Sequence, residues 1–209
     1  MSANWEQYFD RTTKKYRGQT IECYVYKDKS VKILPANLPM PPTDNFYGMF
    51  EGCHQLQDIS ALANWDVSKV KDMGCMFVHC YQLQNITALA NWDVSNVEDM
   101  RFMFCKCHFL QDISALANWD VSKVGDMHYM FQCCEHLQDV TALANWDISN
   151  VKDISGMFFG CYQLSDITAL FNWDASNVED MNSIFCFCPL LKISSDIDAI
   201  KSHLRNLPQ

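Results

Sequence analysis

Apolar and polar positions along this chain repeat with one fixed period. Five tryptophans lie 27 residues apart, and a phenylalanine, a cysteine and a leucine recur at the same interval. The tryptophans are Trp65, Trp92, Trp119, Trp146 and Trp173, and the cysteines are Cys53, Cys80, Cys107, Cys134, Cys161 and Cys188. A period between roughly 20 and 50 residues predicts a unit that buries its apolar side only by stacking on copies of itself.

The unit reads W-D-x-S-x-V-x-D-M-x-x-M-F-x-x-C-x-x-L-x-x-I-S/T-A-L-x-N. Its Leu-to-Ala part, for example residues 83–88, has the length and β-branched content of a short strand. Asn-Trp-Asp-x-Ser indicates a turn, and the Val-to-Cys part has the spacing of a short helix or 3-10 segment. We therefore expect a repeat solenoid, a parallel β-solenoid of about six 27-residue coils with short helical or 3-10 segments.

Such a stack needs caps at both ends, because its end coils would expose apolar faces and strand edges. We predict an N-terminal cap over residues 1–43, with a short helix within 3–16, a hairpin formed by 21–26 and 31–34, and a proline-rich connector over 35–42. The six repeats then occupy residues 44–193. Residues 194–209 have N-cap chemistry and amphipathic spacing, which predicts a capping helix.

Charge narrows the range of partners. The chain carries a formal net charge of −9, yet residues 1–35 hold seven Lys and Arg against four Asp and Glu, so the repeats are strongly acidic. An acidic surface repels phosphate backbones, and we expect no nucleic-acid binding. No apolar stretch approaches the roughly 20 residues that span a bilayer, and the first residues lack the pattern of a secretory signal. We expect no membrane insertion and a cytoplasmic location.

The cysteine column predicts packing rather than chemistry. Cys is small and readily buried, so it suits a tight inward corner in every coil. The other cysteines lack the paired C-x₂₋₄-C spacing of structural zinc, and we expect no metal-binding residues. Two aspartate columns, one containing Asp66 and the other Asp72, are expected to cap turns, with calcium between coils as the alternative.

No arrangement of Ser, His, Asp or Cys typical of a catalytic site is present, and the chain has only seven glycines with which to build a phosphate-binding loop. We therefore expect no enzyme activity and no cofactor.

The positions that change from coil to coil are the candidates for recognition. Several are aromatic, the residue type enriched at binding hot spots. The candidate partner-binding residues are Tyr47, Tyr81, Arg101, Phe102, His108, Phe109, His128, Tyr129 and Tyr162. The alternative is that these are ordinary surface residues, some of them packing on neighbouring coils.

The run Met-Phe-x-x-Cys-x-x-Leu-x-x-Ile, together with Trp-Asp-Val-Ser-x-Val-x-x-Met, resembles the BspA-type leucine-rich repeats over residues 44–193. The resemblance implies a leucine-rich-repeat-like fold, a role in adhesion or protein–protein contact, and a cell-surface or virion location. Our hypothesis is a non-enzymatic module that binds a protein partner along a ladder face. The alternatives are a structural component that self-associates laterally and a metal-stabilised scaffold.

Overall fold

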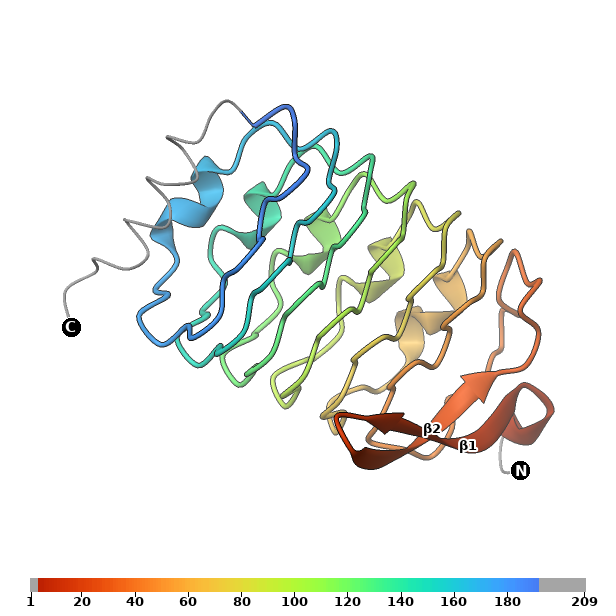
Figure 1. Cartoon of the computed structure of the whole chain (residues 1–209). Helices are drawn as coiled ribbons and strands as arrows, with labels where there is room; N and C mark the ends of the chain where they lie inside the picture. The colour runs from red at the N-terminus through yellow and green to blue at the C-terminus, as the bar shows by residue number, and fades with distance from the viewer. Residues whose placement is uncertain (1–3, 192–209) are drawn as a thin grey trace.

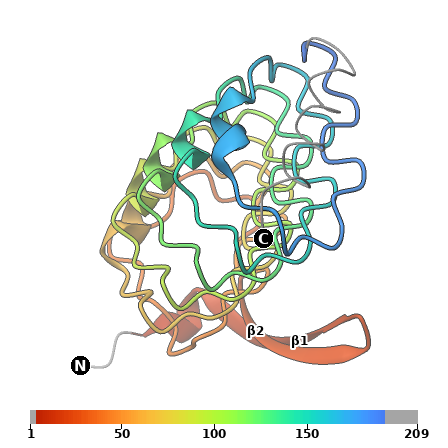
Figure 2. The same cartoon turned by 90° about the vertical axis from the view of Figure 1, so that its left-hand side faces the viewer.

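The structure, a computed structural model, describes residues 4–191 and consists of six coils stacked along one axis, with a β-hairpin at the N-terminal end (Figure 1). Viewed along the stack, successive coils superpose, the 3-10 segments line one side and the hairpin lies on another (Figure 2). The elements are η1 (Trp5–Gln7), β1 (Phe9–Tyr16), β2 (Gln19–Tyr26), η2 (Ser60–Asn64), η3 (Thr87–Leu89), η4 (Ser114–Leu116), η5 (Thr141–Leu143) and η6 (Thr168–Asn172).

The predicted parallel β-solenoid is wrong. Within residues 4–191 the only sheet is the antiparallel pair β1–β2, and no α-helix is present. Between the coils, the parallel pairing is limited to isolated bridges, such as Asp72 with Asp99 and Asp99 with Asp126. The expected strand at 83–88 is also absent, because Thr87 and Ala88 belong to η3. A leucine-rich-repeat-like sheet is therefore not part of this fold.

In the Val-to-Cys part of the repeat, a run of tight turns takes the place of the predicted short helix or 3-10 segment. In the second coil, Phe77 N–H donates to Met103 O of the next coil at 2.9 Å, whereas Val78 N–H donates back to Cys75 O at 3.1 Å. Alternate amides thus bond the neighbouring coil and their own turn. Cys75 and His79 have φ of 57° and 62°, which no regular strand contains. The apolar spacing of this segment is that of consecutive turns, and the sequence does not distinguish them from a short helix.

The N-terminal cap also differs from its prediction. Of the predicted helix within 3–16, the described residues 4–16 contain only η1, and the hairpin pairs Phe9–Tyr16 with Gln19–Tyr26 instead of 21–26 with 31–34. Arg17 and Gly18 form the connecting turn, with φ of 45° and 83°. A two-residue turn of this handedness matches the twist of the strands it joins. The predicted C-terminal helix, 194–209, lies outside the described residues.

The core consists of side-chain columns that run through all six coils. Rings of Phe50 and Phe77 stack with centroids 5.6 Å apart and an interplanar angle of 6°, and this arrangement continues to Phe185. Each repeat tryptophan is buried and its indole N–H donates to a leucine carbonyl of the preceding coil, as Trp119 Nε1 does to Leu89 O at 3.0 Å. The tryptophans therefore both fill the core and connect adjacent coils.

The cysteine column has the packing role that the sequence predicts. Cys107 and its repeat equivalents are buried, and the Cys107 thiol donates to Phe77 O, 3.3 Å away in the preceding coil. Burial raises the pKa of the Cys107 thiol well above its ordinary value, so the group stays protonated. All eleven cysteines are free thiols.

Both aspartate columns cap turns, as predicted. The Oδ1 atom of Asp66 accepts hydrogen bonds from the amide of Ser68 at 3.1 Å and from its hydroxyl at 2.6 Å. In the other column, Asp72 Oδ1 accepts from the Gly74 amide at 2.8 Å. Each carboxylate thus accepts a hydrogen bond from its own coil.

The helical segments of residues 4–191 are short 3-10 segments, and none of them has the length and hydrophobicity of a membrane-spanning helix.

Candidate interaction surfaces

The variable positions of the repeat are defined by backbone conformation. Two positions in each coil have positive φ, and glycine occupies only some of them. The other residues at these positions are Cys75, His79, Phe102, Lys106, Tyr129, Cys133, Ser183 and Phe187. A left-handed conformation costs a non-glycine residue roughly 1–2 kcal/mol, so the chain keeps these side chains against a backbone preference for glycine. Their identity is thus a stronger indicator of function than variability alone.

Three of the candidate residues are buried, which corrects the expectation that they face solvent. Tyr47 is 6% exposed, Arg101 6% and His128 4%. They share one column of the repeat, two positions after the Asp72 column, and the tip of the β1–β2 hairpin packs against it. The aromatic and cationic character of this column therefore serves an intramolecular contact.

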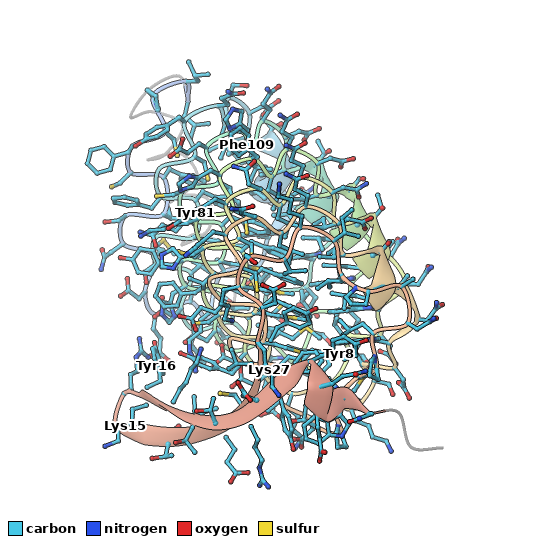
Figure 3. All side chains as sticks on the ribbon, turned by 90° about the vertical axis from the view of Figure 1, so that its right-hand side faces the viewer. Tyr8, Lys15, Tyr16, Lys27, Tyr81 and Phe109 are labelled. Carbon is cyan, nitrogen blue, oxygen red and sulfur yellow. The ribbon has the colours of Figure 1, made fainter. Side chains whose placement is uncertain are left out.

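The tip contact is formed by Tyr16 at the end of β1, which points toward the stack, whereas Lys15 lies on the outer side of the hairpin (Figure 3). The Tyr16 hydroxyl lies 3.1 Å from His128 Nε2, and the Arg101 guanidinium lies 4.0 Å from the Tyr16 ring centroid. Arg101 also pairs with Asp99. At the turn, Arg17 Nη2 lies 3.9 Å from Asp153 Oδ2. The contacts of Tyr16 and Arg17 therefore join the basic N-terminal segment to the acidic repeats.

Three ligand-type side chains meet below the tip. The atoms that Asp126, His128 and Asp153 offer all lie within 4.8 Å of one another, so they could hold a divalent cation. His128 Nδ1 already bonds Asp126, and Arg17 approaches Asp153. Burial alone would raise the Asp126 pKa, but hydrogen bonds from His128 and the charges of His128 and Arg101 outweigh it, so that this pKa is lowered. Each of the two carboxylates of this cluster therefore already has a partner among the described residues.

Phe102 and Tyr129 form a half-buried pair beside the tip contact. Their rings stack with centroids 5.2 Å apart and an interplanar angle of 12°, and Phe102 meets the His128 ring edge-on at 4.6 Å. The Tyr129 ring lies over Gly156, where an added Cβ would approach it to 2.2 Å. Glycine at 156 therefore makes room for this ring. The pair is partly a packing feature and partly an exposed surface.

The remaining candidates form a separate surface, which we name the ring column. It consists of the side chains that follow the core cysteines, namely His54, Tyr81, His108, Phe109, His136 and Tyr162. Tyr81 stacks on both His54 and His108 with centroid separations of 4.9 Å. Phe109 stacks on His136 at the same separation, and Tyr162 is 47% exposed. Tyr81 and Phe109 lie on the stack away from the hairpin (Figure 3).

Carbonyl contacts fix two of these rings. His54 Nδ1 donates to His79 O and His136 Nδ1 donates to His108 O, both at 3.0 Å. His108 Nε2 lies 4.0 Å from Glu135 Oε1. The ring column is therefore preorganised, which lowers the entropy lost when a partner binds.

Sequence reasoning identified most of the ring column but omitted His54 and His136, and it missed the hairpin tip entirely. Tyr16 and Arg17 lie outside the repeats, where no periodic pattern marks them. The one available signal was the contrast between the basic residues 1–35 and the acidic repeats, which favours contact between the two.

The fold and these surfaces define a repeat protein whose 27-residue coils present columns of side chains. The chain matches the family described as "Mycoplasma protein of unknown function, DUF285" over residues 44–164 and 134–200, more than half of its length. The chain belongs to this family. No curated protein and no solved structure gives a match.

Proposed function

We propose that this chain is a non-enzymatic protein-binding module, related to the BspA-type surface proteins, whose partner docks on the ring column. The observation that carries the proposal is the continuous stack of His54, Tyr81 and His108, with ring centroids 4.9 Å apart on an accessible face. The resemblance of residues 44–193 to the BspA-type repeats supports a role in contact with other proteins.

The chemistry of the ring column favours a protein over other ligands. Stacked rings offer apolar faces, and their imidazole and phenol groups offer hydrogen bonds at the edges, a combination that is enriched at protein interfaces. The acidic repeats do not suit a polyanion. A protein segment with apolar side chains and a few cations matches both properties.

The test is capture by the intact chain, followed by affinity measurement with the purified partner. One variant carries Tyr81→Ser, His108→Ser and Tyr162→Ser. The matched control carries Gln84→Ser and Gln111→Ser, which change exposed side chains of the same coils outside the ring column. We expect the ring-column variant to lose at least about tenfold in affinity, or about 1.4 kcal/mol, and the control to bind normally. Equal binding by both variants would contradict the proposal.

A lateral assembly role is the alternative, since aromatic columns on adjacent molecules can also meet each other. Light scattering of the purified chain at micromolar concentration separates the two. A monomer supports a distinct partner, whereas self-association that the ring-column variant abolishes supports assembly instead.

A further inference from the structure

The hairpin leaves one of its strand edges unpaired. Lys27 N–H donates to Tyr8 O at the start of β1, whereas Tyr26 N–H points the other way and donates to Met49 O. In an antiparallel pair, successive residues alternate between these two directions. The main-chain groups of Thr20, Glu22 and Tyr24 therefore point away from β1. Within the described residues these groups have no hydrogen-bond partner. Such an edge is a template for one more strand.

This edge opens onto a groove rather than onto free solvent. A cavity of about 1060 Å³ is lined by side chains from both faces of β2, from Gln19 to Tyr24, as expected of a space along the strand edge. Residues 40–45 form the opposite wall, and Asp66, Asp72 and Asp99 line it from the repeats. The groove lies on the hairpin side of the stack, apart from the ring column.

The opposite wall cannot pair with β2. Pro41 and Pro42 have no amide hydrogen, and the Thr43 amide donates to Pro41 O at 2.9 Å. The Asn45 amide bonds the Thr43 hydroxyl at 3.0 Å. The neighbouring segment therefore satisfies its polar groups locally, and the β2 edge stays open.

The charge of the groove selects the occupant. Arg11 pairs with Glu22 at 2.8 Å, and Arg101 pairs with Asp99, so these four charges offset one another. Asp44, Asp66 and Asp72 then remain against the single cation Lys69. Asp66 is held as a carboxylate, because hydrogen bonds from Ser68 lower its pKa. The groove thus has an excess of negative charge.

We propose that the groove binds an extended basic peptide segment of another protein, which adds to the free edge of β2 as a third strand. Main-chain bonds to Thr20, Glu22 and Tyr24 would supply affinity, and lysine or arginine side chains near Asp66 and Asp72 would supply specificity. This surface does not depend on the ring column, and either proposal stands if the other fails.

The probe is a fluorescein-labelled nonapeptide, Lys-Thr-Lys-Val-Thr-Val-Lys-Thr-Lys, titrated with the full chain by fluorescence anisotropy at low salt. We expect saturable binding with a Kd in the micromolar range, weakened by salt because the attraction is screened. The same peptide with glutamate for lysine should not bind. A peptide N-methylated at alternate residues, which keeps the charge but loses the strand donors, should bind at least about tenfold more weakly.

Two matched variants test the strand edge. Thr20→Pro removes an amide that faces the groove, and Thr13→Pro removes one that faces away from β2 on the outer edge of β1, so neither breaks a bond between the strands. We expect Thr20→Pro to weaken peptide binding about tenfold and Thr13→Pro to leave it unchanged. Asp66→Asn should also weaken it, whereas Asp147→Asn, the same repeat position three coils away, should not.

Three results would overturn the proposal: no saturable binding, equal binding of the N-methylated peptide, or equal effects of the two proline variants. Sedimentation velocity tests whether a second copy of this chain occupies the groove instead. A dimer that Thr20→Pro converts to a monomer would show that it does. The Tyr81→Ser variant should bind the peptide normally, which separates this test from that of the ring column.

Discussion

Lys106 illustrates how backbone conformation sets the role of a residue. It has a φ of 61° at a position where two of the six coils have Gly52 and Gly160. Its side chain is partly exposed, while its amide bonds Gln132 O in the next coil at 2.6 Å. The fold therefore fixes the backbone conformation at position 106, whereas the side chain there can vary from coil to coil.

We expect Lys106→Gly to be more stable than Lys106→Ala by about 1 kcal/mol, because glycine adopts positive φ without the Cβ penalty that alanine retains. In helices and strands the order is the opposite, because glycine is less stabilising than alanine there. Urea denaturation of both variants measures the difference, and a more stable alanine variant would contradict the conformational argument.

At Trp119, in contrast to Lys106, the buried side chain itself is required by the fold. We expect Trp119→Ala to lower the free energy of unfolding by about 3–5 kcal/mol, because it empties a core column and removes the indole hydrogen bond to the Leu89 carbonyl. Tyr129→Ala, which removes a half-buried ring stacked on Phe102, should cost about 1 kcal/mol. Chemical denaturation gives both values, and comparable losses would mean that the inward and outward columns are assigned wrongly.

At the scale of elements, the hairpin contacts the stack at its base and at its tip, and Lys14 of β1 pairs with Glu51 between them. Its base is anchored by Phe9 and Tyr26, which are buried against the Phe50 ring. Its tip is held by Tyr16 on His128 and Arg101. The base contact is apolar and belongs to the core, whereas the tip contact is polar and lies near the surface, so the tip should open without unfolding the stack.

We expect Tyr16→Ala to speed amide exchange in β1 and β2 by about tenfold, because the cation–π contact and the hydrogen bond are worth about 1–2 kcal/mol together. Tyr16→Phe should have a smaller effect, since it keeps the ring, and Lys15→Ala on the outer face should have none. Hydrogen exchange followed by mass spectrometry reports this. Faster exchange throughout the repeats would show instead that the tip supports the whole stack.

At the scale of the whole molecule, stability rests on the repetition of one capped turn. Hydrogen bonds from serine lower the pKa of Asp66, Asp120 and Asp174. A carboxyl with a lower pKa in the folded than in the unfolded chain stabilises the fold while both states are ionised. That contribution disappears as pH falls through the folded pKa, since protons bind the unfolded chain first.

We therefore expect the free energy of unfolding to fall as pH drops below about 4, the ordinary pKa of an aspartate. Asp66→Asn should reduce this dependence. Asp72 should behave in the opposite way, because burial raises its pKa and ionisation destabilises the fold, so Asp72→Asn should increase stability at pH 7. Urea denaturation at pH 7 and pH 3 tests both. Unchanged acid sensitivity in Asp66→Asn would show that the capping carboxylates are not responsible.

The sequence alone determined the repeat length, the number of coils and the inward columns, because a 27-residue period leaves corresponding residues no other way to bury themselves. It also indicated turn capping, since Asp-x-Ser chemistry is local. Only the tertiary structure decided that turns form the Val-to-Cys part, where a short helix was expected, because positive φ at residues such as Tyr129 has no mark in composition. It likewise decided which variable residues face solvent: Arg101 and His128 are buried by a hairpin from outside the repeats, a contact between distant segments that no local pattern encodes.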